Sequence, residues 1–189
     1  MERDVADEDL MLAYRNGDAV SFDRLYSRHK GAVYRYILRH CRNEAIAEEL
    51  FQEVWMNLIK ARERYVVKAK FTTWLYQIAQ NKLIDHYRRQ KPGAGSGLKT
   101  DEFEPDDLTA RVDEQPEQQT QTGKQMAHLF HLLDQLPEEQ KQAFLLREEA
   151  GMSLDEIAEA MEVNAETAKS RLRYAINKLK QGLTAYDSE

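Results

Sequence analysis

The chain has 189 residues, of which 42% are hydrophobic and 32% charged, and a formal net charge of −6. This length gives room for one or two compact domains, and the composition is that of a soluble globular protein. It excludes an internal disulfide, because Cys41 is the only cysteine, and no apolar run is long enough to cross a bilayer.

Helix-forming residues dominate, and only eight glycines and four prolines interrupt them. The sequence therefore predicts an all-α fold. The acidic start, MERDVADEDL, lacks the apolar core of a secretory signal, so the expected location is the cytoplasm.

Apolar residues recur with helical spacing in three segments of the first third of the chain. They predict helices over residues 7–16, 19–40 and 44–61. Asp7 and Asn43 are the expected N-caps of the first and third helices, and Gly17 is expected to end the first. Together with a fourth helix, these segments can bury one shared core.

Acidic and amide side chains gather on the side of the third helix opposite its apolar residues. They are Glu48, Glu49, Gln52 and Glu53. A metal site is not indicated, because no histidine lies at ligand spacing on this helix. The two interpretations left open are an ordinary solvated surface and a docking surface for a basic partner.

Residues 60–91 are strongly basic, with nine cations and two anions. Residues 62–70, RERYVVKAK, predict a loop, and residues 71–91 predict a helix with Thr72 or Thr73 as its N-cap. One side of this helix is apolar, although Ile84 breaks the pattern. Polar groups are expected on the other side, with aromatic rings at its borders: Thr73, Gln77, Gln80, Asn81, Arg88 and Lys91, with Trp74, Tyr76 and Tyr87.

Amides and hydroxyls can read base edges, rings can stack on unpaired bases, and cations can neutralise phosphates. The segment 71–91 therefore predicts a nucleic-acid interface. The alternative is an ordinary surface helix of a bundle with a basic tail. The segregation of acid and base along the chain indicates two partners of opposite charge.

Residues 92–124 hold three of the four prolines and many acids and glutamines. Such a segment cannot bury enough apolar surface to fold alone, so it predicts a flexible acidic linker. It divides the chain into domains over residues 1–91 and 125–189.

The second domain is expected to open with a helix from residue 125 and a further helix over residues 138–149, ended by Gly151. His128 and His131 are three residues apart, which is weak evidence for a shared ligand. Ser153 and Glu156 form a capping-box pattern that opens a short helix ending near Met161.

Asn164 is the expected N-cap of the last helix, predicted over residues 165–181 and ended by Gly182. A short helix, a three-residue turn and a longer helix make a helix-turn-helix pattern. The outward side chains of the last helix combine base-reading and phosphate-binding groups, with a net charge of +4: Glu166, Thr167, Ser170, Arg173, Tyr174 and Asn177, flanked by Lys169, Arg171, Lys178 and Lys180. This pattern predicts docking in a DNA major groove; the alternative is a helical hairpin for protein contacts.

In their order and spacing, three segments resemble the bacterial sigma-70 family, in its small extracytoplasmic-function (ECF) group. AEELFQEVWMNLIK (47–60) resembles region 2.2, and KFTTWLYQIAQNKLIDHYRRQ (70–90) resembles regions 2.3 and 2.4. LDQLPEEQKQAFLLREEAGMSLDEIAEAMEVNAETAKSRLRYAINKLK (133–180) resembles region 4.

The resemblance implies a sigma region 2 domain and a region 4 helix-turn-helix domain that bind core RNA polymerase and promoter DNA. The implied polymerase contacts are Glu48, Glu49, Gln52 and Glu53. The implied −10 contacts, which hold a flipped base as the strands part, are Lys70, Thr73, Trp74, Gln77, Gln80, Asn81, Arg88 and Arg89. The implied −35 contacts are Thr167, Lys169, Ser170, Arg171, Arg173, Tyr174 and Lys178.

The family also implies a partner anti-sigma factor. Trp74-Leu75 stands where primary sigma factors carry paired tryptophans, and Tyr174 replaces a frequent arginine, so the −35 readout is expected to differ. No phosphate loop, activated nucleophile or metal spacing indicates an enzyme or a cofactor. The competing function is a stand-alone helix-turn-helix regulator.

Overall fold

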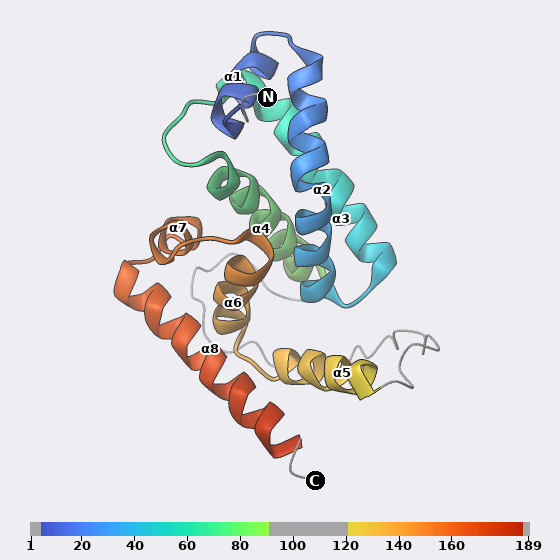
Figure 1. The fold of residues 1–189 in the computed structure, drawn as a ribbon. Helices are drawn as coiled ribbons and strands as arrows, with labels where there is room; N and C mark the ends of the chain where they lie inside the picture. The colour runs from blue at the N-terminus through green and yellow to red at the C-terminus, as the bar shows by residue number, and fades with distance from the viewer. Residues whose placement is uncertain (1–4, 91–120, 187–189) are drawn as a thin grey trace. The chain divides into compact units, whose positions relative to one another are not determined.

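The computed structural model describes residues 5–90 and 121–186, and these residues fold into helices in two compact units (Figure 1). The first unit lies within Met1–Gly95 and the second within Ser96–Glu189. The predicted all-α class with two helical domains is confirmed.

The first unit is a four-helix assembly in which α2 and α3 lie side by side (Figure 1). A single 3₁₀ turn and a loop lead from α3 into α4. The elements are α1 (Asp7–Arg15), α2 (Ala19–Cys41), α3 (Glu44–Ala61), η1 (Arg62–Arg64) and α4 (Phe71–Gln90). These bounds agree with the predicted helices to within one residue at each end.

Only one of the three N-caps predicted in this unit is present. Asn43 caps α3, because its Oδ1 accepts a hydrogen bond from the Ile46 N–H at 3.1 Å. The prediction for α1 is wrong, since Ala6 occupies the N-cap position. The Asp7 carboxylate is instead bound by α2, with Arg28 Nη1 at 2.7 Å and His29 Nε2 at 2.6 Å.

The predicted cap of α4 is also wrong. The helix begins at Phe71, whose backbone N–H donates to Glu8 Oε1 of α1 at 2.6 Å. A carboxylate at this position satisfies one of the free N–H groups and interacts favourably with the helix dipole. Thr73 is 0% exposed and its Oγ1 has no hydrogen-bond partner, so it cannot act as a cap.

The core of the first unit is built from aromatic and aliphatic side chains of all four helices. Tyr36 and Tyr76 meet edge to face with ring centroids 5.1 Å apart, and both are almost fully buried. Tyr76 was expected at the border of its helix and lies in the core instead. Other fully buried side chains are Met11, Leu25, Ile37, Leu58, Phe71 and Leu75.

The contacts of Asp7 with Arg28 and His29 should make part of the free energy of unfolding depend on pH. Burial raises the pKa of this carboxyl, but hydrogen bonds and charges from His29 and Arg28 outweigh burial and lower the pKa below its ordinary value of 3.8. The stabilisation is therefore present above about pH 4 and is lost as the pH falls through the lowered value. We expect Asp7→Asn to lower the urea midpoint at pH 6 and to converge with the wild type once the pH has fallen below the lowered pKa of Asp7. A constant gap across this range would contradict the assignment.

Within residues 121–186, the second unit contains four helices: α5 (Gln121–Asp134), α6 (Glu138–Ala150), α7 (Leu154–Ala160) and α8 (Ala165–Tyr186). The first of them begins four residues before the predicted start, so the end of the predicted linker is helical. Residues 91–120, which hold the rest of that linker, lie outside the described residues. The core between α5 and α8 contains Leu132 and Leu133 of α5, Leu136 just after α5, and Ala175 and Leu179 of α8.

The predicted caps of the second unit are confirmed. The Ser153 hydroxyl accepts from the Glu156 N–H while the Glu156 carboxylate accepts from the Ser153 N–H, which completes the capping box. Asn164 Oδ1 accepts from the Thr167 N–H at 2.8 Å. Gly151 ends α6 in the left-handed conformation, with φ of 65°.

Gly182 was predicted to end the last helix, but it lies inside α8. A Cβ at this position would lie 2.6 Å from Leu132 Cδ1, so the glycine permits the close approach of α5 and α8. The two histidines of α5 have separate partners. His128 Nε2 donates to the Gly182 carbonyl at 3.2 Å, and His131 Nε2 lies 2.9 Å from the Gln135 amide nitrogen.

Candidate nucleic-acid interface

The predicted acidic surface of α3 divides into two parts. Glu48, Glu49 and Gln52 are exposed and share one side of the helix, since Gln52 follows Glu48 by four residues and Glu49 by three. Glu53 is half-buried, and its Oε2 lies 3.0 Å from Lys82 Nζ of α4. The fourth predicted docking residue is therefore engaged in holding α3 against α4.

Met56 follows Gln52 by one helical turn and is 51% exposed. It was not among the predicted docking residues. An exposed apolar side chain within an acidic face provides contact area as well as charge, as protein interfaces do.

The outward side of α4 carries most of the predicted −10 contacts. Asn81, Arg88 and Arg89 are exposed, Lys70 is exposed just before the helix, and Trp74, Gln77 and Gln80 are half-buried. Thr73 is the exception, because it is completely buried in the core. The prediction that Thr73 contacts DNA is therefore wrong, and Lys91 lies outside the described residues.

The Trp74 ring packs against two other aromatic rings. Its ring centroid lies 4.8 Å from that of Tyr65 and 6.1 Å from that of Phe71. Tyr65 is 3% exposed, and burial, followed by the charges of Glu8 and Asp7, raises its pKa to about 12. Trp74 thus packs against two core rings, and its half-buried side chain leaves part of the ring exposed for stacking on an unpaired base.

The hydroxyl of Tyr65 is buried without a hydrogen-bond partner. Leaving such a group unsatisfied is unfavourable by about 1–3 kcal/mol, so its removal should not destabilise the fold. We expect Tyr65→Phe to leave the free energy of unfolding unchanged or raise it by about 1 kcal/mol, measured by urea denaturation. Tyr65→Ala, which also removes the ring beneath Trp74, should lower it by about 3–5 kcal/mol. A loss of stability of about 1 kcal/mol or more in Tyr65→Phe would show that the hydroxyl is hydrogen-bonded.

Exposed apolar side chains accompany the polar ones. Val66 and Val67, at the start of the loop before α4, are 53% and 52% exposed. Ile84, which broke the apolar pattern of the sequence, is 39% exposed and lies one turn beyond Asn81. Its spacing from Gln77 and Asn81 places it on the outward face, where an apolar group can contact a base or a thymine methyl.

The predicted −35 contacts on α8 differ in their exposure. Lys169, Arg173, Tyr174 and Lys178 are exposed, whereas Thr167, Ser170 and Arg171 are half-buried. The Arg173 guanidinium lies 5.2 Å from the centre of the Tyr174 ring. This pair occupies the middle of the exposed face.

Two of the predicted −35 cations contact the rest of their own unit. Arg171 Nη2 lies 3.4 Å from Glu139 Oε1 of α6. Lys178 Nζ donates to the backbone carbonyl of Gln135, just after α5, at 2.7 Å. Both residues stabilise the position of α8, and their contacts with DNA remain predictions.

Within residues 5–90 and 121–186, no three histidine, cysteine or acidic side chains converge as a metal site would require. In the same ranges, none of the helices combines the length and the apolar character needed to cross a membrane.

Comparisons with known proteins identify both units. The family model for sigma-70 region 2 matches residues 25–92, and that for sigma-70 region 4 matches residues 129–179. The RNA polymerase sigma factor CarQ of Myxococcus xanthus is 28% identical over 95% of this chain and 98% of its own length. The ECF sigma factor SigE of Mycolicibacterium smegmatis is 30% identical over 89% of this chain and 64% of its own.

Solved structures share the fold. CnrH, in complex with the cytosolic domain of CnrY, superposes with a TM-score of 0.71 at 20% identity, covering 96% of this chain and 99% of that one. The sigma factor RpoE of Bartonella quintana, in complex with the anti-sigma factor NepR, gives 0.65 at 18% identity, covering 86% and 96%.

A region 2 bundle followed by a region 4 helix-turn-helix defines a two-domain transcription initiation factor. The chain belongs to the sigma-70 family of RNA polymerase sigma factors, and its relatives place it in the ECF group. The predicted family is confirmed, and a stand-alone regulator is not favoured.

Proposed function

We propose that this chain is a dissociable promoter-specificity subunit that binds core RNA polymerase, recognises −35 and −10 promoter elements and assists strand opening. The observation that carries this proposal is that surfaces of different chemistry lie on separate helices of the two units. One unit has an acidic face on α3 and an amide- and cation-rich face on α4, and the other has an exposed helix-turn-helix.

The α3 face would bind the polymerase. Glu48, Glu49 and Gln52 offer two charges and an amide, and Met56 adds apolar contact. Such a face fits a basic surface of the core enzyme, because complementary potentials increase the association rate and fix the orientation of the partners.

The loop before α4 and the outward face of α4 would capture the −10 element as a single strand. Trp74 offers a partly exposed ring for stacking, Asn81 offers an amide for a base edge, and Arg88 and Arg89 offer charges for phosphates. These groups line one face of the helix, as a strand that runs along it would require.

The exposed face of α8 would read the −35 element in the major groove. Arg173 and Tyr174 lie at its centre, and Lys169 is near its N-terminal end. Each good base contact contributes about 1–3 kcal/mol of discrimination, so neither unit alone would select a promoter well. Two modules held on one polymerase gain through their effective concentration.

The partners follow from the same proposal. CnrH and the Bartonella RpoE are described in complexes with the cytosolic domain of CnrY and with the anti-sigma factor NepR. We extend this to the present chain, which would be held inactive by an anti-sigma factor until released. It would work in the cytoplasm beside the polymerase, which supplies all of the catalysis.

Run-off transcription tests the proposal. Purified core polymerase is combined with this chain on linear genomic fragments, with core alone as the control. We expect discrete run-off products only when the chain is present. Binding of duplex DNA by the free chain, with no new products in the presence of core, would instead identify a stand-alone regulator.

A further inference from the structure

Both ends of the loop between η1 and α4 are held by the same helix, α1. At the entry to the loop, Arg15 Nη1 donates to the Tyr65 carbonyl at 3.0 Å. At its exit, the Phe71 N–H donates to Glu8 Oε1 at 2.6 Å. Glu8 and Arg15 are seven residues apart, so they lie two turns apart on one face of α1.

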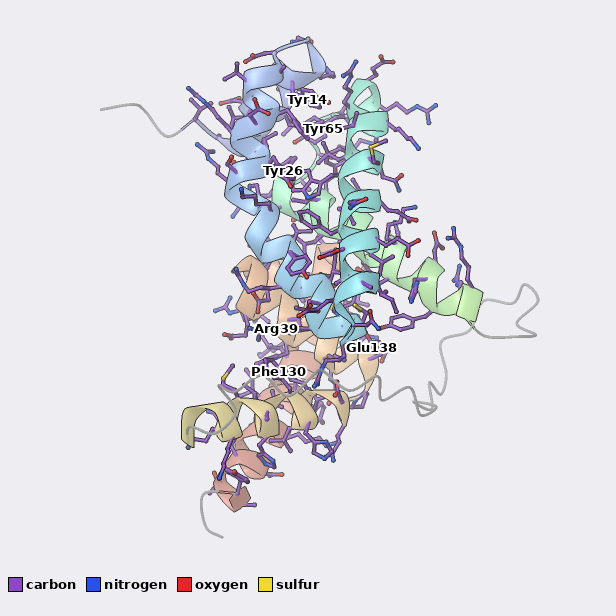
Figure 2. The ribbon with its side chains drawn as sticks, turned by 90° about the vertical axis from the view of Figure 1, so that its right-hand side faces the viewer. Tyr14, Tyr26, Arg39, Tyr65, Phe130 and Glu138 are labelled. Atoms are coloured by element: carbon purple, nitrogen blue, oxygen red, sulfur yellow. The ribbon has the colours of Figure 1, made fainter. Side chains whose placement is uncertain are left out.

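The helix that holds the loop is itself fixed to its neighbours. Asp7 is bound by Arg28 and His29 of α2, at 2.7 and 2.6 Å. At the other end of α1, the Arg62 guanidinium lies 5.4 Å from the centre of the Tyr14 ring. Tyr14 and Tyr65 lie at the same end of the first unit (Figure 2). The two contacts on the loop are thus made by an anchored element.

Between its two ends the loop has no regular secondary structure. Residues 65–70 form no helix or strand, and Val66, Val67, Lys68 and Lys70 are exposed. Fixing the two ends of a short segment removes most of its conformational freedom before it binds. A loop that is already ordered loses less entropy when it contacts a ligand, and it discriminates better between similar ligands.

We propose that α1 positions this loop for promoter recognition, with Glu8 and Arg15 as the positioning residues. The inference rests on the proposed function of the loop in capturing an unpaired base of the −10 strand. Neither residue is required to touch DNA. Their effect would pass through the two backbone groups that they bind, at Tyr65 and Phe71.

Amide hydrogen exchange of the free full-length chain tests the structural part. The variants are Glu8→Ala and Arg15→Ala, and Glu8→Gln keeps an oxygen that can accept from Phe71. Asp9→Ala is the matched control, since Asp9 is an exposed acid on the same helical turn. We expect exchange of the Tyr65 and Phe71 amides, which donate to the Arg62 carbonyl and to Glu8, to become about fivefold faster, relative to α3, in the two alanine variants only. Equal acceleration in α3, or none in the loop, would overturn the proposal.

Sequence selection by the reconstituted holoenzyme tests the functional part. A pool of random single-stranded oligonucleotides of about twelve bases is enriched on core polymerase carrying each variant. We expect Glu8→Ala to reduce the preference at one or two adjacent bases about fivefold, with Glu8→Gln and Asp9→Ala close to the wild type. Unchanged preference in Glu8→Ala would overturn this inference alone. A wild-type holoenzyme that selects no sequence would overturn the proposed function of the loop, and the inference with it.

Discussion

Reversing Glu48 and Glu49 to lysine should weaken binding of this chain to core RNA polymerase by about thirtyfold or more, equivalent to about 2 kcal/mol. Both side chains are exposed on the acidic face of α3. The change replaces attraction by repulsion at two positions of a complementary surface. The affinity is measured by fluorescence anisotropy of the labelled chain at fixed salt.

The control must carry the same change of charge elsewhere on the same unit. Asp9→Lys with Asp23→Lys meets this condition, because both acids are exposed on other helices. Glu53 is left intact in all variants, since its removal would leave Lys82 of α4 without this ion pair. Equal weakening in the control would show that net charge, and not the α3 face, controls the affinity.

Asn81→Ala should slow open-complex formation by about tenfold or more while leaving duplex binding at the −35 element unchanged. The Asn81 amide is exposed in the middle of the α4 face, and a lost base contact removes about 1–3 kcal/mol. Opening is followed by permanganate reactivity of unpaired thymines in the −10 region, and −35 binding by footprinting of the same complexes.

Arg173→Ala provides the reciprocal variant. Removing this exposed guanidinium from α8 is expected to weaken the −35 footprint. Strand opening on a premelted template should be unaffected. We choose Arg173 over Arg171, because Arg171 lies 3.4 Å from Glu139 and its loss would also disturb α6. If each variant impaired both steps equally, the division of labour between the two units would be wrong.

Features that depend on neighbouring residues were predictable from the sequence. The caps at Asn43, Ser153 and Asn164 each join a side chain to a backbone group three residues further on. Helical periodicity likewise identified the α3 face and the helix-turn-helix, because a helix places residues three and four apart on one side.

Features that depend on distant residues were not predictable. The cap of α4 comes from Glu8, sixty-three residues earlier in the chain. Thr73 was expected outside and is buried, since periodicity alone does not set how many sides of a helix its neighbours cover. Gly182 was expected to end a helix, but close approach to Leu132 explains the glycine within it.

The most direct measurement of the central claim is the mapping of transcript 5′ ends made on whole genomic DNA by core polymerase with and without this chain. We expect a new set of start sites, preceded by two shared sequence elements at a constant spacing, and their loss with the Glu48→Lys, Glu49→Lys variant. Identical start sites with and without the chain would contradict it.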